Sequence, residues 1–267
     1  MSFFLRRYGF LLPLILALPL WAQGGPPLLT DDPGTPGNKN WEINTAVTVS
    51  EFQREQDVEA PALDINYGWG ERIQLKYESS WLYLNANGML PANGWANSLA
   101  GVKWRFIDNK KHELAISTYP QFEWSVLASS VRRGLADPGQ SFLLPIEVTK
   151  ALGPIELNLE GGHWFSTNSP GWISGLAVGH QQTKRLELLG EVHRVTGAYA
   201  ANQTVFNQPS TQTVFNLGGR FRLMDAALFI FSAGRSFSGP SSGQPQFIGY
   251  FGVQWLLPVK AEAADRP

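Results

Sequence analysis

The feature that most constrains the fold is a two-residue period of apolar and polar side chains that begins near residue 41 and continues almost to the end of the chain. In residues 41–50, apolar or β-branched side chains occupy the odd positions and mostly polar ones the even positions. Residues 73–81, 155–160 and 213–223 show the same pattern. A strand points successive side chains to opposite faces of its sheet, so each segment predicts a strand with one apolar and one polar face. We therefore expect an all-β protein.

Segments of this kind recur about twelve times along the chain. We expect strands at residues 41–51, 58–67, 72–83, 98–106, 112–124, 140–149, 155–165, 172–181, 186–196, 211–223, 226–236 and 247–256. The connections between them alternate in length. The short connections are 68–71, 107–111, 150–154, 182–185 and 224–225. The longer ones, rich in Gly, Pro, Asn and Ser, are 52–57, 84–97, 125–139, 166–171, 197–210 and 237–246. This alternation is typical of an antiparallel up-and-down transmembrane β-barrel, whose two rims face different compartments.

The tryptophans support the same interpretation. The chain has ten, and all except Trp21 fall at or just beyond the ends of the predicted strands. At the rim with short turns lie Trp41, Trp69, Trp104 and Trp255, and at the rim with long loops lie Trp81, Trp95, Trp124, Trp164 and Trp172. Because indole combines an apolar body with one polar N–H, it prefers the boundary between membrane and water. Two belts of tryptophan are therefore expected around a lipid-embedded barrel.

The N-terminal residues have the features of a secretory signal peptide. Arg6 and Arg7 precede an apolar stretch at residues 10–20, and the small Ala22 precedes a polar segment rich in turn-forming residues. The stretch is short for a membrane-spanning helix, so we expect a signal peptide cleaved after Ala22. The predicted organisation is a signal peptide at 1–22, a periplasmic N-terminal segment at 23–40, the barrel at 41–256 and a polar C-terminal tail at 257–267.

Composition excludes several other classes of protein. The chain has no cysteine, which removes disulfide scaffolds, zinc ribbons and thiol nucleophiles. Its formal net charge is −1, so no basic surface for nucleic acid is expected. Only 16% of the residues are charged, which is low for the surface of a soluble protein with this many strands. Alternation alone does not decide which face meets solvent, so a soluble periplasmic β-protein that binds a ligand stays open as an alternative.

Several short motifs resemble one protein family. Residues 27–37 read PLLTDDPGTPG, and an aromatic-Glu pair at Trp41 and Glu42 opens the first predicted strand. Further likenesses are residues 66–69 (NYGW), 101–106 (GVKWRF) and 187–191 (ELLGE). Together these motifs, spread over most of the chain, resemble the MetA-pathway of phenol degradation family.

The resemblance implies an outer-membrane barrel of transporter type, in some members linked to uptake of aromatic compounds. Two positions depart from the family pattern. Residues 116–120 read ISTYP where the family has an end similar to L-P-T-G, and a polar tail follows Trp255. The first departure weakens the inference that this chain shares the family's substrate. The second distinguishes the chain from barrels that finish on an aromatic residue.

The polar face of the predicted barrel is where we expect functional residues. Acids outnumber bases on it, and Glu147 belongs to the same face. The predicted lumen-lining residues are Glu42, Asp64, Lys76, Glu78, Lys103, Arg105, Glu113, Glu123, Glu156, Glu160, Glu187, Glu191, Arg220 and Arg222. One interpretation is a water-filled passage that mildly favours cations or neutral solutes. The other is a lattice of ion pairs that fills a narrow lumen.

Two further groups of residues were candidates for chemistry. The histidines are His112, His163, His180 and His193, but neither a G-x-S-x-G nor an H-E-x-x-H motif accompanies them, so we expect no catalytic residue and no metal site. The residues 30–32 (TDD) fit three roles: a cation site, part of a plug in the lumen, or a solvated turn, because Asp-Pro-Gly favours turns.

These observations predict a barrel of the bacterial outer membrane that serves as a channel or transporter for small solutes, aromatic or apolar ones included, without chemistry and without a cofactor. The expected partners are the lipid bilayer, a small-molecule solute and the outer-membrane assembly machinery, and no nucleic acid. The alternatives are an outer-membrane enzyme that modifies lipid and a soluble periplasmic β-protein that binds a ligand.

Overall fold

The computed structural model describes residues 25–166, 170–197 and 211–258, so the predicted signal peptide and residues 259–267 of the predicted tail lie outside the described residues. The strands are β1 (Trp41–Glu51), β2 (Glu55–Trp69), β3 (Ile73–Ala86), β4 (Ala92–Asn109), β5 (Leu114–Thr118), β6 (Gln121–Ser125), β7 (Gln140–Leu152), β8 (Ile155–Phe165), β9 (Gly171–Gln181), β10 (Leu186–Gly197), β11 (Thr211–Met224), β12 (Ala227–Ser236) and β13 (Phe247–Leu257). A short helix α1 (Ala128–Arg132) and a 3₁₀ helix η2 (Pro240–Ser242) lie in connections. Neither has the length and hydropathy that crossing a membrane requires.

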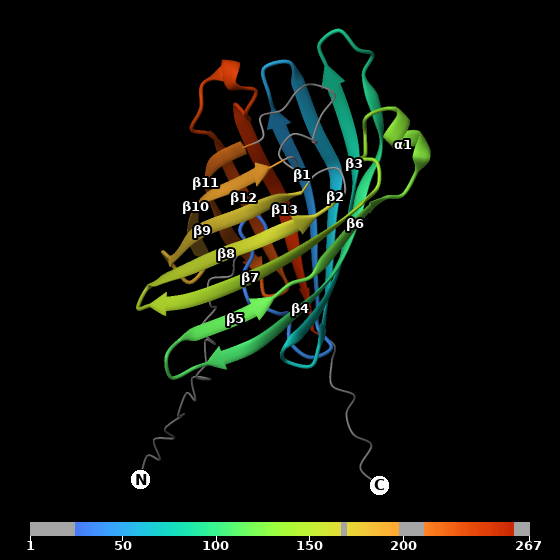
Figure 1. Ribbon diagram of the computed structural model, residues 1–267. Helices are drawn as coiled ribbons and strands as arrows, with labels where there is room; N and C mark the ends of the chain where they lie inside the picture. Colours follow the sequence, from blue (N-terminus) through green and yellow to red (C-terminus); the bar gives the residue numbers. More distant parts are fainter. Residues whose placement is uncertain (1–24, 167–169, 198–210, 259–267) are drawn as a thin grey trace, which may run out of the picture.

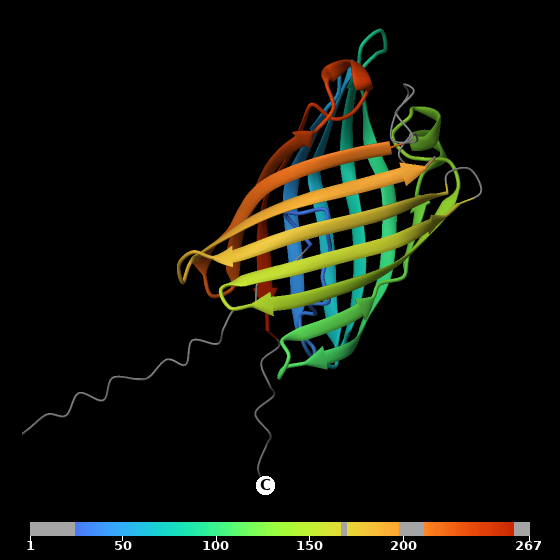
Figure 2. The same cartoon turned by 60° about the vertical axis from the view of Figure 1, so that its left-hand side comes forward.

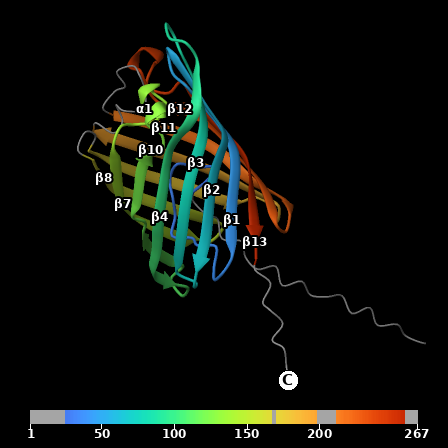
Figure 3. The same ribbon diagram turned by 90° about the vertical axis from the view of Figure 1, so that its right-hand side faces the viewer.

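The strands form one closed antiparallel barrel (Figure 1). Apart from β5 and β6, which do not pair with each other, each strand pairs with its neighbours in the sequence, and β1 pairs with β13 over its full length to close the cylinder. β5 and β6 together fill one position between β4 and β7, which gives twelve positions around the wall. Figure 3 shows β1, β2, β3 and β4 side by side on one wall. The predicted antiparallel up-and-down barrel is confirmed.

The strand predicted at residues 112–124 is in fact two strands, so this prediction was wrong in detail. The break falls at Tyr119 and Pro120. Proline has no N–H to donate to a neighbouring strand, and it therefore interrupts the ladder. The carbonyl of Pro120 still accepts a hydrogen bond of 3.0 Å from the N–H of Val102, so the wall stays closed.

Two connections predicted as long loops are mostly strand. The loop predicted at 52–57 shrinks to residues 52–54, and the loop predicted at 84–97 shrinks to residues 87–91. Cross-strand pairing continues instead, and the rings of Trp81 and Trp95 pack edge to face with centroids 5.5 Å apart. The wall formed by β1–β4 therefore rises above the rest of this rim.

The distribution of side chains is inverted relative to a soluble protein. On β9, Leu176 is 44% exposed on the outer face whereas Ala177 is 1% exposed on the inner face. Carboxylates, amides and basic groups fill the interior, including Glu147 and Lys103. A soluble β-protein would bury its apolar face, so this arrangement contradicts the soluble alternative and fits a barrel whose outer surface meets lipid.

The tryptophan belts are confirmed in part. All four tryptophans of the short-turn rim are exposed, and Trp95 and Trp172 are exposed at the other end. Trp164 differs, because its side chain is only 4% exposed and faces the lumen. On β8 it shares the even-numbered positions with Glu156 and Glu160, which point inward, so the alternation of the strand forces it inside.

Candidate functional site in the barrel lumen

The stretch of residues 25–34, called the inner segment from here on, lies inside the barrel (Figure 2). Glu191 of β10 holds its centre. This carboxylate accepts hydrogen bonds from the N–H of Leu29 at 2.9 Å and from the N–H of Thr30 at 2.8 Å. Glu160 of β8 accepts a third bond, from the N–H of Asp31 at 3.1 Å. Of the three roles considered for residues 30–32, the structure shows the position of a plug in the lumen. The periplasmic location predicted for residues 23–40 stays a prediction.

The next two strands in the wall, β11 and β12, hold the first residues of the inner segment. The Arg220 guanidinium on β11 donates to the carbonyl of Pro26 at 2.9 Å and pairs with Glu187 at 3.2 Å. The Ser232 hydroxyl on β12 donates to the carbonyl of Pro27 at 2.7 Å. These contacts seat the inner segment against the part of the wall formed by β8–β12, where it narrows the lumen.

The barrel wall leaves room for this stretch of chain. A Cβ at Gly175 of β9 would lie 2.4 Å from the Thr30 hydroxyl oxygen, which is closer than any ordinary contact. At Gly68 of β2 a Cβ would lie 1.8 Å from the carbonyl oxygen of Gly37, in the chain that follows the inner segment. Side chains at these two positions would push the chain away from the wall, so the glycines are part of how it fits.

A buried ionic cluster ties the inner segment to β4 and β7. The Lys103 ammonium lies 2.8 Å from Asp31 and 3.6 Å from Glu147, and it donates to the carbonyl of Asp32. It also lies over the Tyr119 ring, 4.6 Å from the centroid. A buried charge is tolerated when it is paired and hydrogen-bonded in this way. Lys103 and Glu147 therefore act as a fixed interior anchor.

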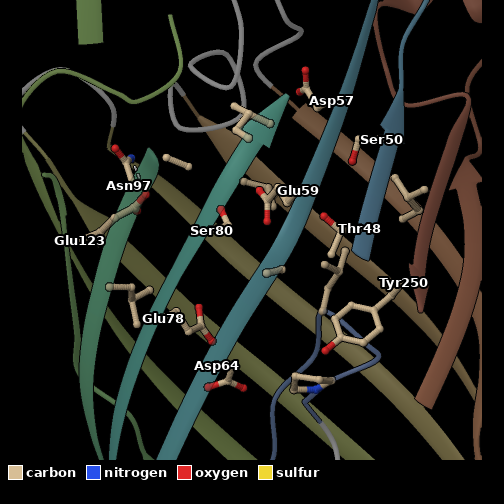
Figure 4. Close-up of a pocket in the computed structure, with 18 of the residues that line it drawn as sticks. Thr48, Ser50, Asp57, Glu59, Asp64, Glu78, Ser80, Asn97, Glu123 and Tyr250 are labelled. Atoms are coloured by element: carbon tan, nitrogen blue, oxygen red, sulfur yellow. Dashed lines mark hydrogen bonds between the residues drawn. The ribbon is translucent and has the colours of Figure 1, made fainter. Parts of the chain in front are cut away.

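Between the inner segment and the rim with long connections lies a cavity of about 920 Å³, which we call the vestibule. Figure 4 shows acidic side chains from β2, β3 and β6 directed into it. Eight carboxylates line it in the described part of the chain: Asp31, Asp57, Glu59, Asp64, Glu78, Glu123, Asp137 and Glu160. The lining contains one lysine, Lys76, which is 3.8 Å from Asp64 and in contact with Glu78. The vestibule is therefore strongly acidic.

The β7–β10 side of the vestibule carries an apolar cluster. Leu143, Trp164 and Ile173 from β7, β8 and β9 form a buried cluster, and Val195 of β10 packs against it. All four side chains line the vestibule. The cavity thus offers most of its strand carboxylates on the side of β2–β6, and an apolar cluster beside Glu160 on the side of β7–β10.

The connection between β6 and β7 covers part of the vestibule. Asn97 of β4 joins this connection to the wall, because it donates to Glu123 at 2.7 Å and accepts from the N–H of Asp137 at 3.1 Å. Burial, followed by the negative charge of Glu123, raises the pKa of Asp137 to about 6. Leu135 is buried in the same connection and also lines the cavity.

The sequence-predicted residues fall into three groups by position. Asp64, Lys76, Glu78, Glu123 and Glu160 line the vestibule. Those on the interior face around and below the inner segment are Glu42, Lys103, Glu156, Glu187, Glu191 and Arg220. The last group lies at the rim with short turns and consists of Arg105, Glu113 and Arg222. That all of them line a solute path stays a prediction.

The third group shows why position in a hairpin matters. Glu113 is exposed in the turn between β4 and β5, with a φ of 49°, so it lies off the inner face of the strands. The alternation of a strand does not extend into a turn, and that is why the sequence pattern placed it wrongly. Arg105 pairs with Asp108 at 3.5 Å and Arg222 with Asp225 at 3.9 Å, both three residues along the chain.

Three vestibule carboxylates, Asp57, Glu59 and Asp137, are not among the residues predicted from the sequence. Asp57 precedes the predicted start of its strand, β2, at residue 58. Glu59 lies within the predicted strand at the opposite parity to Asp64, and a register shift between Glu59 and Ala62 lets both face inward. The signal was present, because acids alternate with other residues through 55–59 (EQDVE), as they do on one face of a strand. Asp137 lies in an irregular connection, where no periodicity could place it.

The histidines do not come together. His193 lines the vestibule, whereas His163 packs on the outer face against Trp172, with ring centroids 4.5 Å apart. His112 is exposed in a turn, and His180 contacts the carbonyl of Pro154. Among the described residues, no group of three or more acidic or histidine side chains is arranged to hold a metal ion.

Comparison with known proteins shows similarity of structure but not of sequence. No family model and no curated protein matches the sequence. The structure is similar to that of the COG4313 outer membrane channel from Pseudomonas putida F1, with a TM-score of 0.69 and 10% identity over 85% of this chain and 98% of that one. It is also similar to the NanC porin (TM-score 0.57, 6% identity, 81% and 100% covered) and to the KdgM porin (0.55, 10%, 80% and 98%). At such identities the similarity establishes the fold, a barrel of the outer-membrane type.

Proposed function

We propose that this chain is an outer-membrane channel for small water-soluble solutes and that it favours cations. The observation that carries the proposal is the acidic vestibule, in which eight carboxylates face one lysine that is itself ion-paired. Carboxylates in a confined space of low dielectric set up a negative potential that concentrates cations. The similarity to outer-membrane channels and porins supports the same class of function.

The two unlike walls of the vestibule narrow the class of solute further. Asp57 and Glu59 offer negative charge, and the cluster of Leu143, Trp164 and Ile173 offers hydrocarbon surface. A small organic cation with an apolar or aromatic part, such as an aromatic amine, would satisfy both walls. This refines the aromatic or apolar solute implied by the family resemblance.

The inner segment divides the vestibule from the short-turn rim, so solute passage requires it to move or to leave a gap. Its contacts are mostly hydrogen bonds to polar side chains, with Leu28 packed in a small apolar cluster against Ala177 and Leu189. These contacts hold the segment less firmly than a packed apolar core would. Regions with few buried apolar contacts are the ones that open locally at low free energy.

Reversal potentials in planar bilayers under a salt gradient test the proposal. The protein should prefer cations, and Glu59→Gln combined with Glu123→Gln should shift the reversal potential toward anions. Glu187→Gln is the matched control, since Glu187 is already paired with Arg220 and does not line the vestibule. Anion preference in the unmutated protein would refute the charge assignment.

A second measurement tests the solute class. An aromatic ammonium ion added on the side of the long connections should block the potassium current at lower concentration than its neutral analogue. The block should weaken in the Glu59→Gln/Glu123→Gln variant. Equal block by the charged and neutral compounds would contradict a role for the carboxylates.

A further inference from the structure

The lipid-facing surface of the barrel carries an uneven distribution of charge. Along the described strands β7–β13, the charged side chains that point outward are Lys150, Arg194 and Arg235. Lys150 lies near the rim with short turns, close to the end of β7. Arg194 and Arg235 lie at the opposite rim, three residues and one residue before the ends of β10 and β12. Charge on a lipid-facing surface is costly near the membrane midplane and tolerated near its interfaces, so these arginines are at headgroup height.

The register brings the two arginines to either side of β11. Arg194 is paired with Thr213, and Arg235 with Phe215, two residues further along β11. Because neighbouring strands are about 4.8 Å apart and two residues of a strand span about 6.7 Å, the two arginine backbones are about 12 Å from each other, within reach of one headgroup for such long side chains. The Arg194 guanidinium bonds the Thr213 hydroxyl at 3.2 Å, which orients it along the outer face, and both arginines are exposed.

Aromatic side chains frame the arginine pair. Phe215 lies between them on β11 and contacts Phe237, with ring centroids 5.0 Å apart. Phe237 and, on β9, Trp172 are strongly exposed at the same rim. Aromatic side chains gather at the boundary between membrane and water, so they mark this rim as lying at headgroup level. At this rim, Glu51 of β1 is a carboxylate on a strand near the arginine pair. The strand β13 separates it from β12, and it is hydrogen-bonded to Gln56, so it does not neutralise the pair.

The geometry points to a binding site for the phosphate-bearing headgroup of an outer-leaflet lipid, formed by Arg194 and Arg235 across β11. A guanidinium presents a planar fork of donors that matches phosphate oxygens, and two of them would clamp one headgroup while its acyl chains follow the apolar face below. The rim with long connections faces the cell exterior in barrels of this type, which places the headgroup in the outer leaflet.

Native mass spectrometry of the full-length barrel in a neutral detergent tests this site, with phosphatidic acid as the probe. The Arg194→Gln/Arg235→Gln variant loses both charged contacts to the phosphate and should bind the lipid about tenfold more weakly, which corresponds to about 1.4 kcal/mol. Lys150→Gln, which removes an outward charge at the other rim, should change the affinity less than twofold. Equal loss in the two variants would overturn the site.

Two further experiments distinguish the guanidinium fork from positive charge alone, and a lipid from free phosphate. Arg194→Lys/Arg235→Lys keeps the charge without the fork, so it should recover only part of the affinity, and heat-modifiable migration verifies that each variant is folded. Inorganic phosphate at millimolar concentration should not displace the lipid, because the acyl chains contribute to binding. Full displacement would overturn a lipid site in favour of one for free phosphate.

Discussion

Thr30 donates two hydrogen bonds to the same oxygen of Glu191, from its backbone N–H and from its hydroxyl, each 2.8 Å long. The two residues are 161 positions apart in the sequence. Glu191 also accepts from the N–H of Leu29, and from Asn216 on the neighbouring strand at 2.5 Å. One carboxylate on the barrel wall thus fixes the middle of the inner segment.

Removing this carboxylate should loosen the inner segment. Glu191→Ala deletes the acceptor of three of its bonds, and hydrogen bonds to a charged group contribute ~1.5–3 kcal/mol each before relaxation. We expect a larger single-channel conductance and more frequent open events in planar bilayers. Glu156→Ala serves as the control, because Glu156 accepts from Asn158 on its own strand. Identical conductance in the two variants would show that Glu191 does not hold the passage closed.

A methyl group at Gly175 should displace the inner segment by steric contact. Its Cβ would lie 2.4 Å from the Thr30 hydroxyl oxygen, so Gly175→Ala is expected to raise conductance and to increase cleavage of the N-terminal stretch by an added protease. Gly161→Ala on the adjacent strand β8 is a matched control, because nothing described lies within 4 Å of a Cβ there. If both variants resist protease as the parent does, the segment is not seated against Gly175.

Charge on the outer surface should be penalised according to depth. Leu159 lies near the middle of β8 and is 51% exposed, so Leu159→Arg should destabilise the folded barrel in lipid by ~2–4 kcal/mol. Ile155→Arg, at the first position of the same strand, should cost no more than about 1 kcal/mol because its side chain reaches the interface. Unfolding in urea, followed by heat-modifiable migration, measures both. An equal penalty would contradict the proposed position of β8 in the membrane.

The cation preference should weaken in acid. Burial and the charge of Glu123 raise the pKa of Asp137 from 3.8 to about 6, so this carboxylate gains a proton as the pH falls through 6. The folded protein binds more protons than the unfolded chain between these two values, so Asp137 lowers the free energy of unfolding as the pH rises across that window. Reversal potentials at pH 7 and pH 5 should therefore differ less in Asp137→Asn than in the parent. A pH response unchanged by the substitution would exclude Asp137 as its source.

The tertiary structure also changes which acids are expected to control selectivity. From the sequence, Glu187 and Glu191 were candidates because they share the polar face of one strand. In the structure Glu187 is paired with Arg220, and Glu191 is occupied by the inner segment. Asp57, Glu59 and Glu123 face the vestibule instead. The alternation along a strand shows on which face a side chain lies. Only the folded barrel shows which side chains on that face are already paired or hydrogen-bonded.

The sequence by itself determined the barrel. Strand alternation is a local property, because each side chain points opposite to its neighbour whatever the rest of the chain does. The order of the strands and the polarity of their two faces could therefore be predicted from residues such as Leu159 and Glu160. The same locality explains the errors at Pro120, where a proline ends a ladder, and at Glu113, where a turn interrupts the period.

Only the tertiary structure decided what fills the lumen. The contact of Thr30 with Glu191, the space at Gly175 and the two unlike walls of the vestibule join residues far apart in the sequence. No local pattern records them, because they depend on the circumference of the closed barrel and on the path that residues 25–34 take through it. The Asp-Pro-Gly sequence favours a turn both in water and in the lumen, so it does not specify the position of the segment. The polar interior of the barrel supplies the hydrogen-bond partners that hold the segment inside.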